Sequence, residues 1–441
     1  MAKEEKNNEL PARNASRSDA GGMEKIISLC KRRGFVFPGS EIYGGLANSW
    51  DYGPLGVELK NNIKAAWWKK FVLQRDDMAG IDAALIMNPK VWENSGHLKN
   101  FSDPLVECKK CHHRFRADQL EDLKKCPDCA GELTESKQFN LMLKTYLGPT
   151  QEEADRVYFR PETAQAIFVD FKNVLQTTRK KLSFGIAQIG KAFRNEITPG
   201  NFIFRTREFE QMEIEYFVKP VDWEKAFEMW RGQMWDWMTE VLGLKKENIF
   251  ENNIAQEELA HYSKKTIDFE YKYPFGQKEL YGLAYRTDFD LKNHFAEPPY
   301  EDPDAKEKIY PDVIEPSLGV DRSVLAVLLD AYTQEADPEK NGEGRIILKL
   351  KPSLAPYKVA VSCIKKNDEK LVAKAKEVYE NLKKEFSADF DNRGNIGKFY
   401  YSQDEIGTPY CVTVDFETLE NNTVTIRDRD TAKQERVRIE D

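Results

Sequence analysis

Several common features are missing from this chain of 441 residues, and each absence argues against a class of protein. No apolar run is long enough to cross a bilayer, so we expect no membrane-spanning helix. The first 22 residues are polar and lack the apolar region of a secretory signal, so we expect a disordered tail there. Neither GxxxxGKS/T nor a strand-linked GxGxxG occurs, so any bound nucleotide must be held by side chains on a sheet.

Histidine is scarce, and acidic residues outnumber basic ones. Five histidines and the absence of a Ser-His-Asp or Cys-His arrangement leave few candidates for imidazole chemistry. The formal net charge of -8 argues against unspecific coating of nucleic acid, although a local basic patch could still bind one RNA. Seven cysteines, four of them in paired positions, indicate a reducing compartment such as the cytoplasm, and a metal site instead of disulfides.

The length allows two or three domains. Apolar residues at helical spacing predict helices over residues 57–72, 165–175, 223–241, 323–329 and 369–386. Strand-like runs cover residues 83–87, 358–364, 411–416 and 423–426. Core packing explains the aromatic stripe of 223–241 better than a binding box does. A linker over 333–344 separates a large N-terminal part from a smaller α/β domain.

The most informative stretch, Phe193 to Tyr216, reads as two strands joined by a Pro-Gly turn. Side chains alternate faces along a strand, so Arg194 and Glu196 share one face of the first strand. On the second strand, one face carries Arg205, Arg207, Phe209, Gln211, Glu213 and Glu215. If the two faces coincide, the surface suits a polyphosphate, a flat base and an ammonium group. A solvated hairpin is the alternative, and Phe209 alone fits a buried core ring equally well.

Two CxxC pairs separated by fourteen residues predict a zinc site; they are formed by Cys108, Cys111, Cys126 and Cys129. Each pair places two sulfurs on one tight turn, and the two turns complete a tetrahedron around Zn²⁺. Four thiolates leave no open position for water, so the site would be structural. His112 and His113 could compete as ligands, and an empty, degenerate ribbon is the alternative. The isolated Cys30, Cys363 and Cys411 are expected to be packing residues.

Further charged clusters lie at the starts of expected helices. Arg322 ends the segment EPSLGVDR and begins an apolar helix, where the dipole favours anions; a phosphate partner would explain an arginine there. An ordinary surface arginine is the alternative. Glu162, in RPETAQ, could be no more than a first-turn charge, and the segment from Tyr285 to Asp288 is similarly ambiguous.

Together these pieces resemble a class II aminoacyl-tRNA synthetase. Motif 2 of that class has an Arg-x-Glu, a loop, then Arg or His, a Phe four positions later and an acid four further. The matching positions here are Arg194, Glu196, Arg205, Phe209 and Glu213. Arg322 matches the arginine of motif 3, and residues 57–89, with Pro89 at the end, match the weaker motif 1.

Within the class, the chain resembles the homodimeric glycyl-tRNA synthetases over nearly everything after residue 22. The segments that carry this resemblance are GFVFPGSEIYGG (34–45), WDYGPLG (50–56), RPETAQ (160–165), YRTDFDL (285–291) and EPSLGVDR (315–322). Motif 3 keeps only Gly319 of the usual glycine series, with Ser317 and Asp321 beside it. This departs from the general class pattern but agrees with the glycine family.

The resemblance implies an architecture of two domains and two insertions. An α+β catalytic domain with a mainly antiparallel sheet would span residues 23–340. It would contain a zinc-ribbon-like insertion at 105–135 and a second insertion, between motifs 2 and 3, at about 220–275. An α/β anticodon-binding domain would span 355–441. A homodimer is implied as well, and Trp67 and Trp68 on the motif 1 helix look exposed.

The resemblance further implies how ATP is held. Arg194 would clamp the α-phosphate, and Arg205 with Arg322 the outer phosphates. Glu196 would contact the adenine edge, and Phe209 would stack on its face. These four charged residues are the implied catalytic set: Arg194, Glu196, Arg205 and Arg322. The full implied set of ATP contacts is Arg194, Asn195, Glu196, Phe204, Arg205, Thr206, Arg207, Glu208, Phe209, Glu279, Leu280, Gly319, Val320, Asp321 and Arg322.

Glycine, Mg²⁺ and tRNA-Gly would occupy the remaining sites. Glu279 would help to hold Mg²⁺ or ATP, and several carboxylates would surround the glycine ammonium. The implied glycine contacts are Arg116, Glu162, Phe209, Glu210, Gln211, Met212, Glu213, Arg286, Glu315, Ser317 and Gly319. The C-terminal domain would read the anticodon; its candidate RNA contacts are helix 369–386, Arg427, Arg429, Arg436 and Arg438, although a solvated charged surface explains most of them singly.

Three interpretations follow for the whole chain. It could be a glycine enzyme that forms glycyl-adenylate from ATP and then transfers glycine to tRNA. It could be a synthetase of the same class for another amino acid. It could also be a relative that binds RNA without catalysis, although the intact set Arg194, Glu196, Arg205 and Arg322 argues against that. The sequence assigns no role to Glu215.

Overall fold

The computed structural model describes residues 20–120, 122–149, 151–335 and 344–440. Most of the expected N-terminal tail and most of the expected linker at 333–344 therefore lie outside the described residues. The last three residues of the expected tail, 20–22, instead begin a helix, α1 (Ala20–Arg33). Among the described residues, every helix is too short or too polar to cross a membrane.

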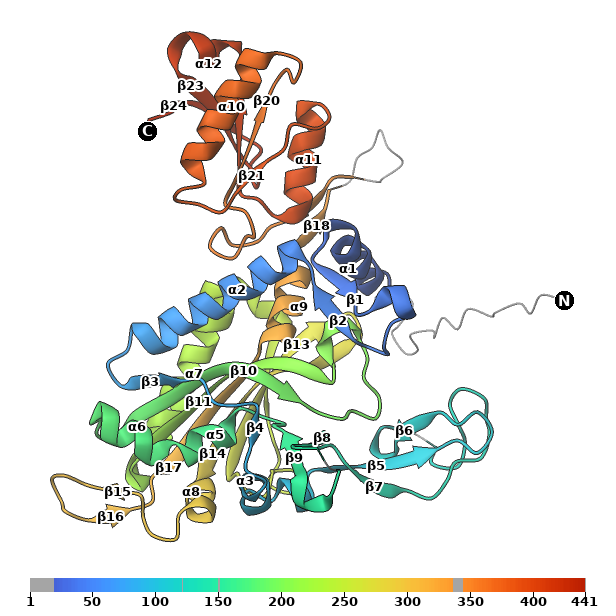
Figure 1. Ribbon diagram of the computed structural model, residues 1–441, viewed down its shortest axis with the longest axis vertical. Coiled ribbons are helices and arrows are strands. Elements are labelled where there is room, and N and C mark those ends of the chain that lie inside the picture. Colours follow the sequence, from blue (N-terminus) through green and yellow to red (C-terminus); the bar gives the residue numbers. More distant parts are fainter. Residues whose placement is uncertain (1–19, 121, 150, 336–343, 441) are drawn as a thin grey trace.

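A seven-stranded sheet forms the centre of the larger domain (Figure 1). In spatial order its strands are β12 (Ile249–Asn253), β13 (Lys265–Tyr273), β14 (Gly276–Thr287), β17 (Asp312–Gly319), β11 (Glu208–Val218), β10 (Phe184–Phe193) and β3 (Met78–Ile81). Only β10 and β3 pair in parallel, which confirms a mainly antiparallel sheet. The segment expected as an insertion between motifs 2 and 3 supplies β12 and β13, so it is part of this sheet.

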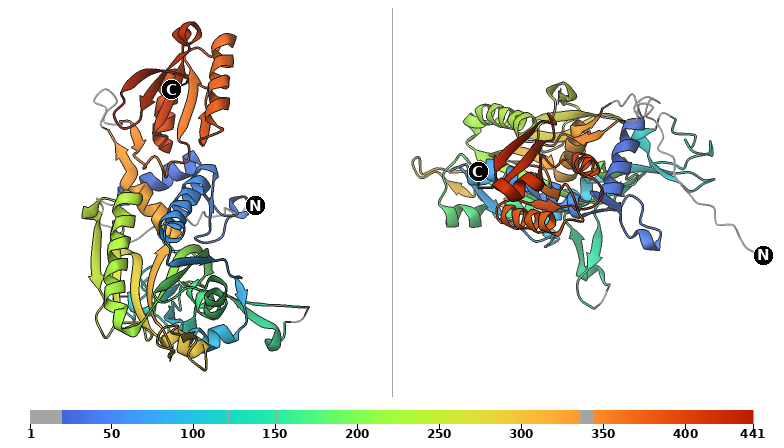
Figure 2. Two further views of the ribbon diagram at one scale, coloured as in Figure 1. Left: turned by 90° about the vertical axis from the view of Figure 1, so that its left-hand side faces the viewer. Right: turned by 90° about the horizontal axis from the view of Figure 1, so that it is seen from above.

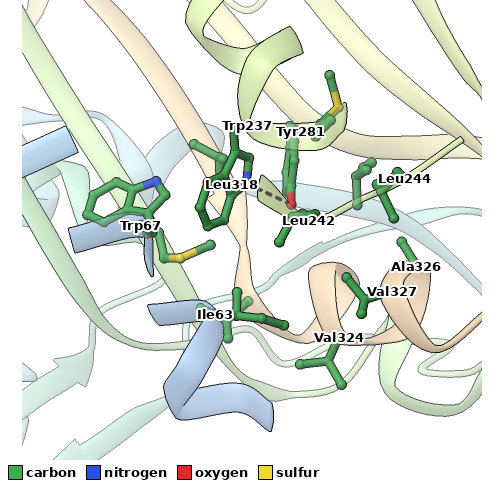
Figure 3. Close-up of a cluster of buried hydrophobic side chains, with 14 of the residues drawn as sticks. Ile63, Trp67, Trp237, Leu242, Leu244, Tyr281, Leu318, Val324, Ala326 and Val327 are labelled. Atoms are coloured by element: carbon green, nitrogen blue, oxygen red, sulfur yellow. Dashed lines mark hydrogen bonds between the residues drawn. The ribbon is translucent and has the colours of Figure 1, made fainter. Parts of the chain in front are cut away.

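Helices α2 (Pro54–Trp68), α7 (Trp223–Asp236) and α9 (Val320–Ala331) cover one face of the sheet; α2 and α7 continue into η2 (Lys69–Leu73) and η7 (Trp237–Val241). Period-two alternation sends Met212, Ile214 and Leu318 into this core, where they are buried. Figure 3 shows Trp237 between helix and sheet, with its indole N–H donating to the Tyr281 hydroxyl at 3.3 Å. Ile63 of α2 lies in the same cluster. The aromatic stripe of 223–241 is thus core packing, as expected.

Trp67 corrects one expectation. Its side chain is fully buried in the core between α2 and the sheet, because it lies on the same helical face as Ile63 (Figure 3). Trp68 is half-buried against Gly80 of β3, where an added Cβ would meet its ring at 2.3 Å. These tryptophans therefore supply no exposed surface that would argue for a dimer.

The opposite face of the sheet is covered only at one end, by α5 (Ala164–Val169), α6 (Phe171–Thr178) and α8 (Phe289–His294). The single helix expected over 165–175 is thus broken at Asp170. The strand expected over 83–87 shrinks to β4 (Ile86–Met87), and the strand after α2 that joins the main sheet is β3. The uncovered part of this face is left for a functional site.

The cysteine-rich segment projects from the larger domain as its own three-stranded sheet (Figure 1). Its strands are β6 (Arg114–Arg116), β5 (Ser102–Glu107) and β7 (Lys137–Asn140). At its base lie α3 (Lys90–Asn94), α4 (His97–Asn100) and a second small sheet of β4, β9 (Arg156–Phe159) and β8 (Lys144–Tyr146). Backbone bonds tie this base to the main domain: Leu141 N–H donates to Phe101 at 3.0 Å, and Asn195 N–H donates to Leu141 at 2.8 Å.

The C-terminal domain is a separate α/β unit at one end of the molecule (Figures 1 and 2). Its sheet has the order β21 (Ala388–Phe390), β20 (Val359–Cys363), β22 (Tyr410–Val414), β23 (Thr423–Asp428) and β24 (Gln434–Arg438). Its helices are α10 (Glu369–Leu382), α11 (Ile396–Ile406) and α12 (Phe416–Asn421). This confirms the α/β character expected for this part of the chain, and the strands predicted at 358–364, 411–416 and 423–426 correspond to β20, β22 and β23.

Two of the arginines proposed to contact RNA are structural. Arg427 is 5% exposed and bonds Asp404 at 3.0 Å, and Arg429 is 2% exposed and donates to the carbonyls of Gly407 and Leu350. Sequence reading missed this because an arginine on a strand looks the same whether it faces water or a buried acid. Arg438 remains mostly exposed, with a side-chain exposure of 64%.

In the described part of the chain, three two-stranded pairs complete the fold, and one of them leads from the larger domain to the smaller one. The strands β1 (Val36–Pro38) and β2 (Trp50–Tyr52) pair near α1, and β15 (Tyr300–Glu301) pairs with β16 (Lys308–Ile309). The pair β18 (Tyr332–Gln334) and β19 (Ile346–Leu348) leads from α9 toward the C-terminal domain. Helix α1 meets that domain through ion pairs from Arg32 and Arg33 to Glu405 of α11.

Candidate active site

The uncovered face of the main sheet carries two adjoining cavities. The first, of about 270 Å³, is lined among others by Arg194, Glu196, Arg205, Phe209, Glu279 and Arg322. The second, of about 320 Å³, is lined among others by Glu162, Glu213, Tyr262, Glu315 and Asp268. Arg194, Gln211 and Ser317 line both cavities. The structure therefore brings the arginines of motifs 2 and 3 to one side of a group of carboxylates.

The connection between β10 and β11 is longer than the expected tight hairpin. The first strand ends at Phe193 and the second begins at Glu208, so Arg194, Glu196 and Arg205 lie in a loop. The N–H of Asn195 donates to Leu141 instead of to the partner strand, which ends the ladder there. Strand alternation was thus the wrong reason for placing Arg194 and Glu196 together, although the loop does bring them to the same cavity.

Each arginine of the first cavity is held by identifiable partners. The Nε of Arg194 donates to the Pro161 carbonyl at 3.0 Å, and its guanidinium lies between the rings of Phe101 and Phe209, 5.3 Å from each centroid. Arg205 pairs with Glu196 at 3.0 Å. Such planar, charged forks suit phosphate oxygens.

Arg322 occupies the first turn of α9, as expected. Its Nη1 lies 3.1 Å from a carboxylate oxygen of Glu279 and 2.9 Å from the Glu279 carbonyl. Its guanidinium also lies 4.5 Å from the centroid of Phe204. The neighbouring Arg322 charge lowers the pKa of Glu279, so this carboxylate is ionised. An anion that enters the cavity could therefore bind Arg322, whose present ion-pair partner is Glu279.

The second cavity has carboxylates with different partners. Glu213 accepts hydrogen bonds from the Thr163 N–H at 3.1 Å and the Ser317 hydroxyl at 2.7 Å. Glu315 accepts one from Arg286 at 2.8 Å. Glu162 lies 3.4 Å from the His97 Nε2 and accepts from Gln165 at 3.1 Å. The first-turn interpretation of Glu162 is therefore insufficient, because its side chain is largely buried among polar partners.

Burial and neighbouring charges move the pKa values of these acids in different directions. Burial would raise the pKa of Glu162, but His97 and Arg286 outweigh burial and lower it well below its usual range. Burial, and then the charge of Glu162, raise the pKa of Glu213. Burial raises the pKa of Glu315 to about 8 against the opposing charge of Arg286. Three acids on one cavity that differ in this way form a strongly polar, negatively biased wall.

The segment RPETAQ is anchored by its arginine. Arg160 is 1% exposed and donates to the carbonyls of Lys191 at 2.7 Å and Ala83 at 2.9 Å. Gly190 makes room for it, since an added Cβ there would lie 2.1 Å from the Arg160 Nη2. Arg160 thus fixes the backbone that presents Glu162 to the second cavity.

Met212 and Val320 of the implied contact sets are buried away from these cavities, whereas Glu210 borders the first cavity but is held by two lysines. Met212 and Val320 are fully buried in the core on the helix-covered face, as strand alternation requires for Met212. Glu210 is held by Lys60 at 3.1 Å and by Lys64 at 3.0 Å, both from α2. Neighbouring residues of motif 2 on β11 thus lie on opposite faces of the sheet.

Asp321 borders the first cavity, whereas Glu208 and Arg116 line neither cavity; all three are held by other side chains. Asp321 accepts from Tyr52 at 2.6 Å and from Lys60. Glu208 is exposed and pairs with Lys191. Arg116 is held in the ribbon by Asp103 at 2.8 Å and by Asp118. The structure therefore does not bring Arg116 to the carboxylates around the proposed amino group.

Sequence reasoning missed residues that act on the site from other elements. His97, from α4, contacts Glu162, and Asp290, from α8, binds Arg286 at 2.8 Å. Thr163 donates to Glu213. Thr163 and Asp290 lie inside the motif segments RPETAQ and YRTDFDL, so the sequence could have indicated that they belong to the site. Nothing in the sequence indicates His97, because its neighbour Glu162 is 65 positions away.

The four cysteines of the ribbon converge. Their sulfurs all lie within 4.8 Å of one another, with Cys108 and Cys129 at 3.5 Å and Cys111 and Cys126 at 3.6 Å. With Zn–S bonds of about 2.3 Å, the edges of a tetrahedral site would be about 3.8 Å. The backbone N–H groups of Lys110 and Cys111 point at the Cys108 sulfur, as suits a thiolate. The donor set therefore fits Zn²⁺. The other three cysteines are buried, in keeping with packing roles.

Comparisons with known proteins agree with this geometry. The family described as "tRNA synthetase class II core domain (G, H, P, S and T)" matches residues 144–332, and the "Anticodon binding domain" family matches residues 358–441. A glycine–tRNA ligase of Alkaliphilus oremlandii is 53% identical, covering 95% of this chain and 96% of its own length. Glycine–tRNA ligases of Alkaliphilus metalliredigens (52%; 96% and 97%) and Geobacillus kaustophilus (53%; 95% and 96%) are similar to the same extent. The chain belongs to the glycine–tRNA ligase family of class II aminoacyl-tRNA synthetases.

Proposed function

We propose that this chain ligates glycine to tRNA-Gly at the expense of ATP, through a glycyl-adenylate intermediate. The observation that carries the proposal is the junction of an arginine-lined cavity with a carboxylate-lined one, with Arg194 at the boundary. This junction supports a triphosphate and an amino acid bound side by side. The family relationship supports the same activity.

ATP occupies the first cavity. Arg194 binds the α-phosphate, while Arg205 and Arg322 turn from their present acid partners to the outer phosphates. Phe209 is partly exposed and stacks on the adenine, with Glu196 at the edge of the base. Because the guanidinium of Arg194 already lies between two rings, its position is set before ATP binds.

Glu279 is the residue that would hold Mg²⁺. Its carboxylate lines both cavities beside Arg322, and hard cations such as Mg²⁺ prefer carboxylate oxygens. When bound, Mg²⁺ would neutralise the phosphate charge that the arginines leave uncompensated.

Glycine occupies the second cavity with its ammonium group among Glu162, Glu213, Glu315 and Ser317. Glycine offers only an amino and a carboxyl group, so acids around the ammonium are the available handles. A methylene in a hydrophobic pocket is discriminated by only about 10 to 200-fold. The acids close to Cα would exclude a methyl group more strongly, since the methyl group would displace an acid from its hydrogen bonds.

The reaction needs no protein nucleophile. The glycine carboxylate attacks the α-phosphorus of ATP and pyrophosphate leaves; the terminal ribose hydroxyl of the tRNA then attacks the acyl carbon. Catalysis comes from alignment of the two substrates and from arginines placed where charge develops. This agrees with the arginines and acids that line the two cavities.

The remaining assignments follow from the other parts of the chain. We infer that Cys108, Cys111, Cys126 and Cys129 hold one structural Zn²⁺. Residues 23–340 form the catalytic domain, and residues 355–441 bind the anticodon. The protein acts as a homodimer in the cytoplasm, where its free thiols persist.

Exchange of pyrophosphate into ATP, with each amino acid supplied in turn, tests the proposal. We expect glycine to support exchange and alanine almost none. Comparable rates with alanine would reject the pocket assignment. Exchange driven by a different amino acid would favour another synthetase of the class, and no exchange with any would favour a non-catalytic relative.

A further inference from the structure

Glu215 is a buried acid that none of the proposed steps uses. It lies on β11 two residues beyond Glu213, and its side chain is 0% exposed. Neither carboxyl oxygen has a hydrogen-bond partner among the residues that the structure describes. An ionised carboxylate without any donor is among the most costly groups to bury in a protein.

The strand register places Glu215 opposite a second acid. In the β11–β17 pair, Glu213 faces Ser317 and Tyr216 faces Ile314, so Glu215 lies opposite Glu315. One carboxyl oxygen each from Glu213, Glu215 and Glu315 lie within 4.8 Å of one another. Two like charges this close in a buried site cannot both ionise readily, so one of the group keeps its proton.

The available donors decide which acid keeps the proton. Glu315 has the Arg286 guanidinium at 2.8 Å, and Glu213 has Thr163 and Ser317. Arg286 also binds Asp290 through two of its nitrogens, so each of its three nitrogens already has a carboxylate partner other than Glu215. On the other side of β11, residue Ile186 of β10 faces Glu215 and offers no side-chain donor. Glu215 is therefore the acid without compensation.

We propose that Glu215 is a neutral, protonated acid beneath the carboxylate-lined cavity, and that it is a positioning residue for the glycine ammonium. This rests on the proposed function of that cavity. As a neutral acid, Glu215 keeps an O–H that can donate to a carboxyl oxygen of Glu213 or Glu315, each of which has one within 4.8 Å, and it thereby fixes that side chain toward the substrate. An ionised Glu215 would have no hydrogen to donate and would repel both neighbours.

The charges around Glu215 support this assignment. Burial, and then the charge of Glu315, raise its pKa well above the usual range; Glu213 and Asp290 act in the same direction, and only Arg286 opposes them. These groups come from β17, β11, α8 and β14, the elements that carry its charged neighbours. Three acids, Glu315, Glu213 and Asp290, therefore act on Glu215 against one buried arginine.

Infrared difference spectroscopy of the full-length protein tests the protonation state directly. At neutral pH the wild-type protein should show the C=O stretch of a buried, protonated carboxylic acid, and Glu215→Gln should lose that band. A wild-type spectrum without the band, or a band that survives in Glu215→Gln, would overturn the proposal. This measurement needs neither glycine nor tRNA, so it is independent of the activity assigned to the site.

Steady-state pyrophosphate exchange tests the positioning role. Glu215→Ala should raise the KM for glycine roughly tenfold or more while the KM for ATP stays near the wild-type value. Glu215→Gln, which is neutral and keeps a hydrogen-bond donor, should recover most of that loss. If Glu215→Gln is as impaired as Glu215→Ala, the acid is ionised and the proposal fails. If Glu215→Ala does not fold, the spectrum and the Glu215→Gln kinetics decide the question.

Discussion

In the proposed function, individual residues of the second cavity recognise the ammonium group of glycine. Glu213 accepts from Thr163 and Ser317 and lines the cavity, so it is both fixed in position and directed at the substrate. Its location on the uncovered face follows from strand alternation, since Met212 and Ile214 point into the core. A single substitution there should therefore affect glycine binding without disturbing the hydrophobic core.

Glu213→Gln should raise the KM for glycine by about 10 to 100-fold, because a hydrogen bond to a charged group contributes about 1.5–3 kcal/mol. The KM for ATP should change little. Pyrophosphate exchange at varied glycine concentration measures both constants. Glu240→Gln, at an exposed position on η7, is the matched control. An unchanged glycine KM in Glu213→Gln would contradict the assignment of the ammonium site.

Asp268 makes stability depend on pH. Burial, and then the charges of Glu279 and Glu270, raise its pKa from 3.8 to about 7. The raised pKa means that the folded state binds this proton more tightly than the unfolded state does. Stability from this group is therefore full below pH 3.8 and is lost as the pH rises through about 7.

Asp268→Asn should remove that dependence. In buffer without Mg²⁺, the variant should melt at the same temperature as wild type near pH 4 and higher at pH 8. After allowance for solvent screening the gain is about 1 kcal/mol, or about 2 °C. Differential scanning calorimetry across this range measures the difference. If the melting temperature of Asp268→Asn relative to wild type instead falls as the pH rises, Asp268 ionises readily in the folded protein.

At the scale of elements, the cysteine ribbon supports the first cavity through its base. Phe101, which precedes β5, packs on the Arg194 guanidinium, and Leu141, which follows β7, accepts the N–H of Asn195. The two ends of the ribbon thus contact the loop between β10 and β11, which we propose holds ATP. A metal that orders the ribbon would thereby order this contact.

Cys126→Ser should lower the zinc content from about one ion per chain to near zero. It should also raise the KM for ATP by about two- to fivefold, because the cation–π contact of Phe101 contributes about 0.5–1 kcal/mol. Elemental analysis and pyrophosphate exchange measure these effects. Cys363→Ser, at a buried thiol outside the ribbon, is the control and should keep its zinc. If zinc-free Cys126→Ser had a normal KM for ATP, the ribbon would have no influence on the ATP site.

At the scale of the whole molecule, few ion pairs join the N-terminal helix to the C-terminal domain. Arg33 donates to Glu405 at 2.5 Å, and Arg32 donates to the same carboxylate at 2.7 Å. Figure 2 shows the C-terminal domain standing away from the main sheet. The pairing therefore orients an anticodon-binding domain relative to a distant catalytic site.

Glu405→Gln should lower kcat/KM for tRNA in aminoacylation by about fivefold, since a partly exposed pair contributes about 1 kcal/mol. Pyrophosphate exchange, which does not involve tRNA, should be unaffected. Comparing the two assays isolates the effect of domain orientation. Glu385→Gln, at an exposed site on the same domain, is the control. Equal loss in both assays would mean that the substitution damages the catalytic domain itself.

Local pattern was sufficient for much of the fold and part of the site. Apolar periodicity predicted the helices that became α2, α7 and α10, and the CxxC spacing predicted the four converging sulfurs. The motif 2 spacing predicted that Arg194, Arg205 and Phe209 would line one cavity. These features depend on residues close in the chain, or on a resemblance that already encodes the fold.

Tertiary structure alone decided which side chains meet. Trp67 looked exposed on its helix but is buried against the sheet, and Arg427 looked available to RNA but pairs with the buried Asp404. The sequence by itself determined the composition of the site: arginines, acids and four cysteines at diagnostic spacing. Only the folded chain places Glu215 opposite Glu315 and pairs Arg286 with Glu315. Strand register and burial depend on contacts between segments that are distant in the sequence.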